Sequence, residues 1–114
     1  MHKTGVWLKQ VVESEAFKSA PVKIVVIHMP PSNNRDWHGR KEITRLFMPI
    51  LNNAGIDLML CGHLHRTSYI EKGKENNNFP ILVNSANTRA SVNVTSSGIK
   101  IFIVDASGKT VKTY

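Results

Sequence analysis

The chain has 114 residues, of which 41% are hydrophobic, and its 15 Lys and Arg against 8 Asp and Glu give a formal net charge of +7. This length suits one core and excludes a multidomain protein. No apolar run approaches the roughly 20 residues of a membrane-spanning helix, and the single cysteine, Cys61, excludes an internal disulfide. We therefore expect one domain over residues 1–114 and no membrane partner.

The basic residues are spread from Lys3 to Lys112 and form no block. Nucleic-acid-binding segments usually cluster their basic residues and interleave them with aromatic side chains, and neither feature is present here. An anionic substrate fits the same positive charge. We expect no nucleic-acid partner. No secretion signal is visible at the start of the chain, which leaves the compartment open.

The first part of the chain predicts a helix and then a strand. Residues 6–17 place apolar side chains close to helical spacing, which predicts an amphipathic helix that is followed by Ala20 and Pro21. Residues 22–27 are mostly β-branched and predict a strand buried on both faces, as in a parallel sheet. The polar stretch that follows, residues 29–39, has the length and composition of a functional loop.

A second helix and strand follow this loop. Residues 40–54 repeat apolar side chains at helical spacing, and Pro49 inside the pattern predicts either a kink or the start of a new helical segment. Gly55 is a left-handed stop signal. Residues 56–61 form a second apolar run. Strand, helix and strand with short joints predict a βαβ unit with parallel strands and a right-handed crossover.

The sequence beyond Arg66 predicts short strands separated by turn residues. We expect strands at residues 67–71, 80–84, 92–95, 99–104 and 110–114. The last three form an antiparallel meander, joined by the turns Ser97-Gly98 and Ser107-Gly108. The three asparagines at positions 76–78 are interpreted as a loop tip.

Three histidines stand where the two predicted strands end. His28 follows the first strand, and His63 and His65 follow the second in the run Gly62-His63-Leu64-His65. Ligands of open α/β sheets bind outside the carboxyl ends of the strands, so the fold should bring these imidazoles to one edge. An extended segment would point His63 and His65 the same way, whereas a tight turn would splay them toward two ions. A single histidine after a strand is often a surface residue, but the joint placement favours a metal site.

Carboxylates are scarce around these histidines. Between His28 and Arg66 the acidic residues are Asp36, Glu42 and Asp57, and the last two are expected away from the strand ends. Ions of a two-metal hydrolytic site lie roughly 3.5–4 Å apart and need anionic ligands between them. The chain is therefore not expected to complete such a site alone.

Two segments, residues 24–31 (IVVIHMPP) and residues 55–66 (GIDLMLCGHLHR), resemble the C-terminal half of the calcineurin-like metallophosphoesterases, a family that includes the purple acid phosphatases. The resemblance implies an α/β fold that is half of an αββα sandwich, with one mixed β-sheet containing a βαβ unit and a C-terminal antiparallel meander. The family's earlier signatures, D-x-H, G-D-x-x-D and G-N-H-[DE], are absent from the sequence. Residues 1–114 would then be the C-terminal portion of a longer enzyme.

The resemblance also implies a site and a reaction. His28 and His63 would bind one metal ion and His65 the other, while His38 and Arg66 would border the substrate as catalytic residues. The complete enzyme would hold two divalent or trivalent ions, such as iron, manganese or zinc, and would hydrolyse a phosphoester. The isolated chain would be inactive.

The implied partners are a phosphoester substrate and the N-terminal half of the parent chain. The inner face of the sheet should be apolar and exposed without that half, which predicts a dimer of the isolated chain through this face. The alternative interpretation is a non-catalytic metal-binding or protein-interaction module of the same fold.

Overall fold

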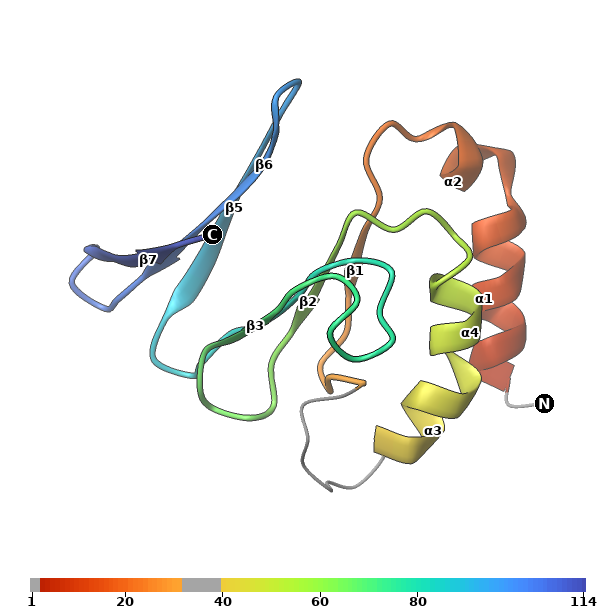
Figure 1. Ribbon diagram of the computed structural model, residues 1–114, viewed down its shortest axis with the longest axis horizontal. Helices are drawn as coiled ribbons and strands as arrows, with labels where there is room; N and C mark the ends of the chain where they lie inside the picture. The colour runs from red at the N-terminus through yellow and green to blue at the C-terminus, as the bar shows by residue number, and fades with distance from the viewer. Residues whose placement is uncertain (1–2, 32–39) are drawn as a thin grey trace.

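The structure is a computed structural model that describes residues 3–31 and 40–114, and it is built in three layers (Figure 1). Helices form the first layer, a four-stranded mixed sheet the second, and a three-stranded antiparallel sheet the third. We call these two sheets the mixed sheet and the meander sheet. None of the helices in the described ranges has the length and apolar character that a bilayer crossing requires.

In the described ranges, all helices precede the second strand, and most strands follow the helices. The helices are α1 (Lys3–Glu13), α2 (Glu15–Ser19), α3 (Arg40–Leu46) and α4 (Met48–Leu51). The strands are β1 (Ile24–Val26), β2 (Leu58–Cys61), β3 (Ser68–Ile70), β4 (Ile81–Val83), β5 (Arg89–Thr95), β6 (Gly98–Val104) and β7 (Thr110–Thr113).

The first helical segment is interrupted at Ser14. This residue has extended backbone angles (φ −70°, ψ 150°), and its hydroxyl accepts a hydrogen bond from the Phe17 amide at 3.2 Å. A serine oxygen that satisfies a free amide in this way is a common helix start. The single helix predicted over residues 6–17 is therefore wrong in detail, because Ser14 caps a second helix.

The second helical segment divides into α3 and α4. Pro49 lies in the first turn of α4, where a missing N–H breaks no intrahelical hydrogen bond. The prediction of a new segment at this proline is confirmed. Gly55 has φ +72°, so its left-handed conformation is confirmed, but α4 ends earlier than predicted, at Leu51 with Asn52 as its C-cap.

The mixed sheet has the strand order β1-β2-β4-β3. Strands β1, β2 and β4 are parallel, and β3 pairs with β4 in the antiparallel sense. The parallel pairing predicted for the first two strands is confirmed. Because three parallel strands lie side by side, their carboxyl ends share one edge of the sheet.

The meander sheet has the order β5-β6-β7, as predicted, and forms a sheet of its own. Its turns contain Gly98 and Gly108, both at positive φ. One cluster of buried apolar side chains joins the two sheets: Leu58, Leu82, Ile101 and Ile103. A second cluster lies on the helix side of the mixed sheet: Met48, Leu51, Ile56, Met59, Cys61, Ile70, Phe79, Ile81 and Val83.

Strand β1 is an edge strand with one uncovered face. Ile24 is 38% exposed and Val26 is 77% exposed, so the predicted burial on both faces is wrong. The parallel register aligns Ile24 with Leu58 and Val26 with Leu60, which places these side chains on the face toward the meander sheet. The meander sheet covers that face at β2 and β4 and leaves it open at β1.

The asparagine run at positions 76–78 contains a buried residue rather than a simple loop tip. The side chain of Asn77 is 1% exposed. It accepts a hydrogen bond from the Glu75 amide at 2.8 Å and donates to the carbonyls of Glu71 and Phe79 at 3.0 and 2.7 Å. Asn77 therefore holds together the connection between β3 and β4.

Candidate metal-binding edge of the mixed sheet

The parallel ladder between β1 and β2 continues past both strands. The Ile27 amide donates to the Leu60 carbonyl at 3.0 Å, and the Gly62 amide donates to the His28 carbonyl at 2.8 Å. These bonds hold the residue after β1 beside the residue after β2. The backbone itself therefore sets His28 against the start of the Gly62-His63-Leu64-His65 segment.

The imidazoles of His28 and His63 are in direct contact. Their ring centroids are 5.2 Å apart and their planes are inclined by 82°, so one ring meets the other edge to face. His28 is exposed and His63 is half-buried. The structure thus brings together two of the histidines that the sequence placed at neighbouring strand ends.

The segment that carries His63 and His65 is a tight turn. The Leu64 amide donates to the Gly62 carbonyl at 2.9 Å. Both histidines have positive φ, 71° at His63 and 57° at His65. Non-glycine residues rarely adopt this left-handed conformation, and they often do so at functional sites. Of the two geometries left open by the sequence, the turn is the one observed.

Gly62 packs against His28. A Cβ atom built on this glycine would lie 3.6 Å from His28 Nδ1 and 3.8 Å from the His28 carbonyl oxygen. Both distances are ordinary van der Waals contacts. The space beside the His28 ring therefore accepts a methyl group, which would contact the ring directly.

The end of β4 adds polar residues that the sequence analysis did not single out. The Asn84 amide donates to the Cys61 carbonyl at 2.9 Å, which sets Asn84 at the same edge. Its side chain accepts from the Thr88 hydroxyl and donates to the Thr88 carbonyl, both at 2.8 Å. The Asn84 side chain therefore closes the loop after β4. The local sequence contains no pattern that predicts its pairing with Thr88.

The other predicted residues lie apart from the histidine pair or outside the described ranges. Asp57 is at the opposite end of β2. Its amide donates to the Lys23 carbonyl, and its carboxylate accepts from the Lys23 amide, both at 2.8 Å. Arg66 follows the turn and is exposed. His38 and Asp36 fall in residues 32–39, outside the part of the chain that the structure describes.

The histidine pair fits a metal ion in part. Imidazole is a good ligand for zinc, iron and other transition metals. Within residues 3–31 and 40–114, however, no three His, Cys, Asp or Glu side chains gather closely enough to hold an ion. Burial raises the pKa of Cys61 to about 12, so its thiol stays protonated and is a poor ligand. The described residues therefore offer part of a site and not a complete one.

Comparisons with known proteins agree with this fold. The sequence pattern of the calcineurin-like phosphoesterases matches residues 2–67. Purple acid phosphatase 18 of Arabidopsis thaliana is 33% identical over 73 residues, which cover 60% of this chain and 17% of that protein. The structure described as GAP50, the anchor in the inner membrane complex of Plasmodium, superposes with a TM-score of 0.73 at 17% identity.

The structural match covers 97% of this chain and 40% of the GAP50 chain. The chain thus spans less than half the length of both relatives. The mixed sheet and the antiparallel meander are those of a metallophosphoesterase half, as the sequence predicted, and the meander forms a sheet of its own. The match to the family pattern extends over more than half of the chain and includes both histidine-bearing strand ends. The chain belongs to the calcineurin-like phosphoesterase family.

Proposed function

We propose that this chain is the C-terminal part of a metal-dependent phosphoester hydrolase. The contact between His28 and His63 carries the proposal, because their ring centroids lie 5.2 Å apart at neighbouring strand ends. Two imidazoles that share one ion, each with a nitrogen roughly 2.0–2.1 Å from it, have centroids about 5 Å apart. The spacing of the pair therefore suits one shared ion.

His28 and His63 are assigned to one ion and His65 to the other. The left-handed turn at positions 63–65 supports this division, because neighbouring histidines diverge in a tight turn and align in an extended strand. When bound, two ions such as iron, manganese or zinc would neutralise phosphoryl charge and activate water for attack on phosphorus. Arg66 and His38 would border the substrate, where the positive charge of Arg66 and the hydrogen-bond donors of both side chains would bind phosphoryl oxygens.

The uncovered face of β1 supports a role for an N-terminal half. Ile24 and Val26 extend an apolar face whose neighbouring part is buried by the meander sheet. In the complete protein this half would cover the face and bring the anionic ligands. The isolated chain would cover it with a second copy and would remain inactive. The net charge of +7 suits a phosphoester substrate.

The test is the substitution His65→Ala in the full-length enzyme, assayed with 4-nitrophenyl phosphate. Loss of turnover with an unchanged thermal unfolding midpoint is expected, because an exposed ligand contributes to chemistry more than to folding. His2→Ala is the control that removes a histidine without a proposed role. Retained turnover in His65→Ala, or destabilisation as its main effect, would favour a non-catalytic module instead.

A further inference from the structure

The loop after β4 lies at the edge of the mixed sheet that carries His28 and His63, which we call the histidine edge. The loop runs from Asn84 to Thr88, and the hydrogen bond from the Asn84 amide to the Cys61 carbonyl (2.9 Å) holds its first residue there. Figure 1 shows this loop beside the loop that follows β2. A substrate bound at the histidine edge would therefore have the loop after β4 as a neighbour.

The side chains of this loop stabilise its conformation. The Asn84 side chain and Thr88 exchange two hydrogen bonds of 2.8 Å, and the hydroxyls of Ser85 and Thr88 are also 2.8 Å apart. Strand β5 begins directly after Thr88, so these bonds also position Arg89, the first residue of that strand. A loop that is ordered before binding loses less entropy when a ligand arrives.

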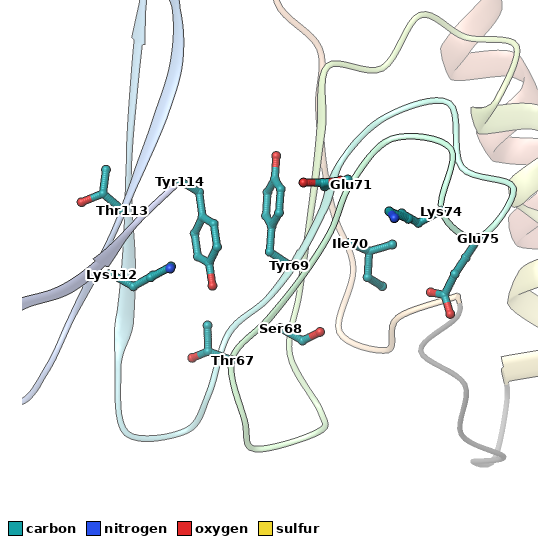
Figure 2. Close-up of a pocket in the computed structure, with 10 residues that line it drawn as sticks. All are labelled: Thr67, Ser68, Tyr69, Ile70, Glu71, Lys74, Glu75, Lys112, Thr113 and Tyr114. Carbon is teal, nitrogen blue, oxygen red and sulfur yellow. The ribbon is translucent and has the colours of Figure 1, made fainter.

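The position of β5 relative to the mixed sheet is fixed as well. Ala90 and Val92 pack in the apolar cluster between the two sheets. The rings of Tyr69 and Tyr114 stack with centroids 4.6 Å apart and join the sheets a second time (Figure 2). Because side chains alternate along a strand, Arg89 lies on the face of β5 that is turned away from the mixed sheet. Packed sheets are about 10 Å apart, so its side chain lies roughly that far from the histidine edge or farther.

An open hollow of about 560 Å³ lies beside Arg89. Residues 86–88 of the loop line it on one side, and Val104, Asp105 and Ala106 line it on the other. The Arg89 side chain is exposed, and within residues 3–31 and 40–114 it forms no ion pair. The hollow therefore has a positive charge that no carboxylate of these residues neutralises.

The carboxylate of Asp105 lines the hollow but is bound within its own turn. Its Oδ1 atom accepts hydrogen bonds from the Ser107 hydroxyl (2.6 Å), the Ser107 amide (2.9 Å) and the Lys109 amide (3.0 Å). These three donors stabilise its negative charge away from Arg89. An arginine guanidinium binds a phosphate or carboxylate group through two parallel hydrogen bonds. The hollow therefore suits an anionic group.

We propose that Arg89 and this hollow bind a second anionic group of the substrate, at the end remote from the phosphoester that is hydrolysed. The inference rests on the proposed function and names its substrate class, which is elongated phosphoesters with an anionic group at the far end. A compact monoester at the histidine edge leaves the hollow empty. Arg89 is thus a specificity-determining residue that takes no part in the attack on phosphorus.

The first test follows the NMR signals of the ¹⁵N-labelled chain, without metal, during titration with methylphosphonate or with acetate. Saturable shifts of the Arg89 Nε–H and of the amides of residues 86–88 are expected, and the tighter-binding anion identifies the preferred group. Arg89→Ala should abolish the shifts at residues 86–88, whereas Lys100→Ala, at an exposed position of β6 outside the hollow, should preserve them. Absent shifts, or shifts that survive in Arg89→Ala, would overturn the proposal.

The second test measures substrate selectivity in the full-length enzyme. Octanediol with a phosphate at each end is compared with octanediol that carries one phosphate. Arg89→Ala should lower the ratio of their kcat/KM values about tenfold, because a charge-assisted pair is lost, and Arg89→Lys should lower it less. Lys100→Ala should leave the ratio unchanged. A ratio that Arg89→Ala does not change would overturn the proposal.

The two tests separate this inference from the proposed function. The anion titration needs no metal and no turnover, so saturable binding by an inactive enzyme would contradict the hydrolase and leave the anion site standing. An active enzyme without anion binding at the hollow would contradict this inference alone.

Discussion

The imidazole of His28 meets that of His63 edge to face, with 5.2 Å between their centroids. These residues are far apart in sequence, and their strand ends are held together by the backbone hydrogen bonds from the Ile27 amide to the Leu60 carbonyl (3.0 Å) and from the Gly62 amide to the His28 carbonyl (2.8 Å). The geometry of the histidine pair is therefore set by the parallel sheet. Substitutions that disturb the backbone beside the two histidines should alter the geometry of the pair as strongly as substitutions of the histidines themselves.

Gly62→Val should displace the His28 ring, whereas Gly62→Ala should not. The Cβ of alanine would lie 3.6 Å from His28 Nδ1, an ordinary contact, and valine adds two methyl groups in the same space. We expect unchanged zinc affinity for alanine and a loss of about tenfold for valine, as is typical when the support of a ligand is disturbed. Isothermal titration with zinc checks this. Equal affinity for the two variants would contradict the packing argument.

Val26→Lys should reduce self-association of the chain. Val26 is a 77% exposed apolar side chain on the edge strand β1, and a lysine there opposes the docking of a second copy. Val111→Lys changes a 51% exposed valine on β7 and serves as the matched control. Sedimentation velocity should show a dimer for the unmodified chain and for Val111→Lys, and a monomer for Val26→Lys. A monomeric unmodified chain at high concentration would argue against this interface.

Asn77→Ala should lower the free energy of unfolding by about 2–3 kcal/mol. The substitution removes three hydrogen bonds of a buried side chain, one from the Glu75 amide and two to the Glu71 and Phe79 carbonyls. Asn93→Ala, an exposed position on β5, should change the unfolding free energy by less than about 0.5 kcal/mol. Urea denaturation measures both. Similar values for the two variants would show that the Asn77 hydrogen bonds contribute little.

The turn between β6 and β7 should be sensitive to acid through Asp105. The pKa of this carboxyl lies below its ordinary value of 3.8. The largest cause is the hydrogen bond from the Ser107 hydroxyl, and hydrogen bonds from backbone amides add to it. Its contribution to stability is thus present above pH 3.8 and is lost as the pH falls through the lower folded value. In an NMR titration Ser107→Ala should raise the pKa of Asp105. Ser97→Ala, in the other serine–glycine turn, should leave this pKa unchanged. An unchanged pKa of Asp105 in Ser107→Ala would show that the Ser107 hydroxyl is not the cause of the shift.

Features encoded by neighbouring residues were predicted from the sequence. The left-handed Gly55, the helix start near Pro49 and the turns of the meander each follow from the conformational limits of one or two residues. The convergence of His28 with the second strand end followed from topology, since parallel neighbours end at one edge of a sheet.

Features that depend on distant partners were missed. The apolar run of β1 indicated burial on both faces, but residue type alone does not reveal whether a covering layer reaches the edge of the sheet. The burial of Asn77 depends on hydrogen bonds within a folded loop, and the Tyr69–Tyr114 stack joins strands of different sheets. Ser14 was missed because apolar spacing resumes after the break, so the periodicity of the two helices looks continuous.

The most direct measurement is a zinc and manganese titration of the chain beside the double variant His28→Ala, His63→Ala, with His2→Ala as the control. The account predicts saturable binding to the chain and to His2→Ala, and its loss in the double variant, because the paired imidazoles are the assigned ligands of one ion. Binding that survives in the double variant would contradict the assignment of His28 and His63. If the chain binds neither ion, the titration is repeated with the N-terminal half restored, and failure to bind there would contradict the metal site itself.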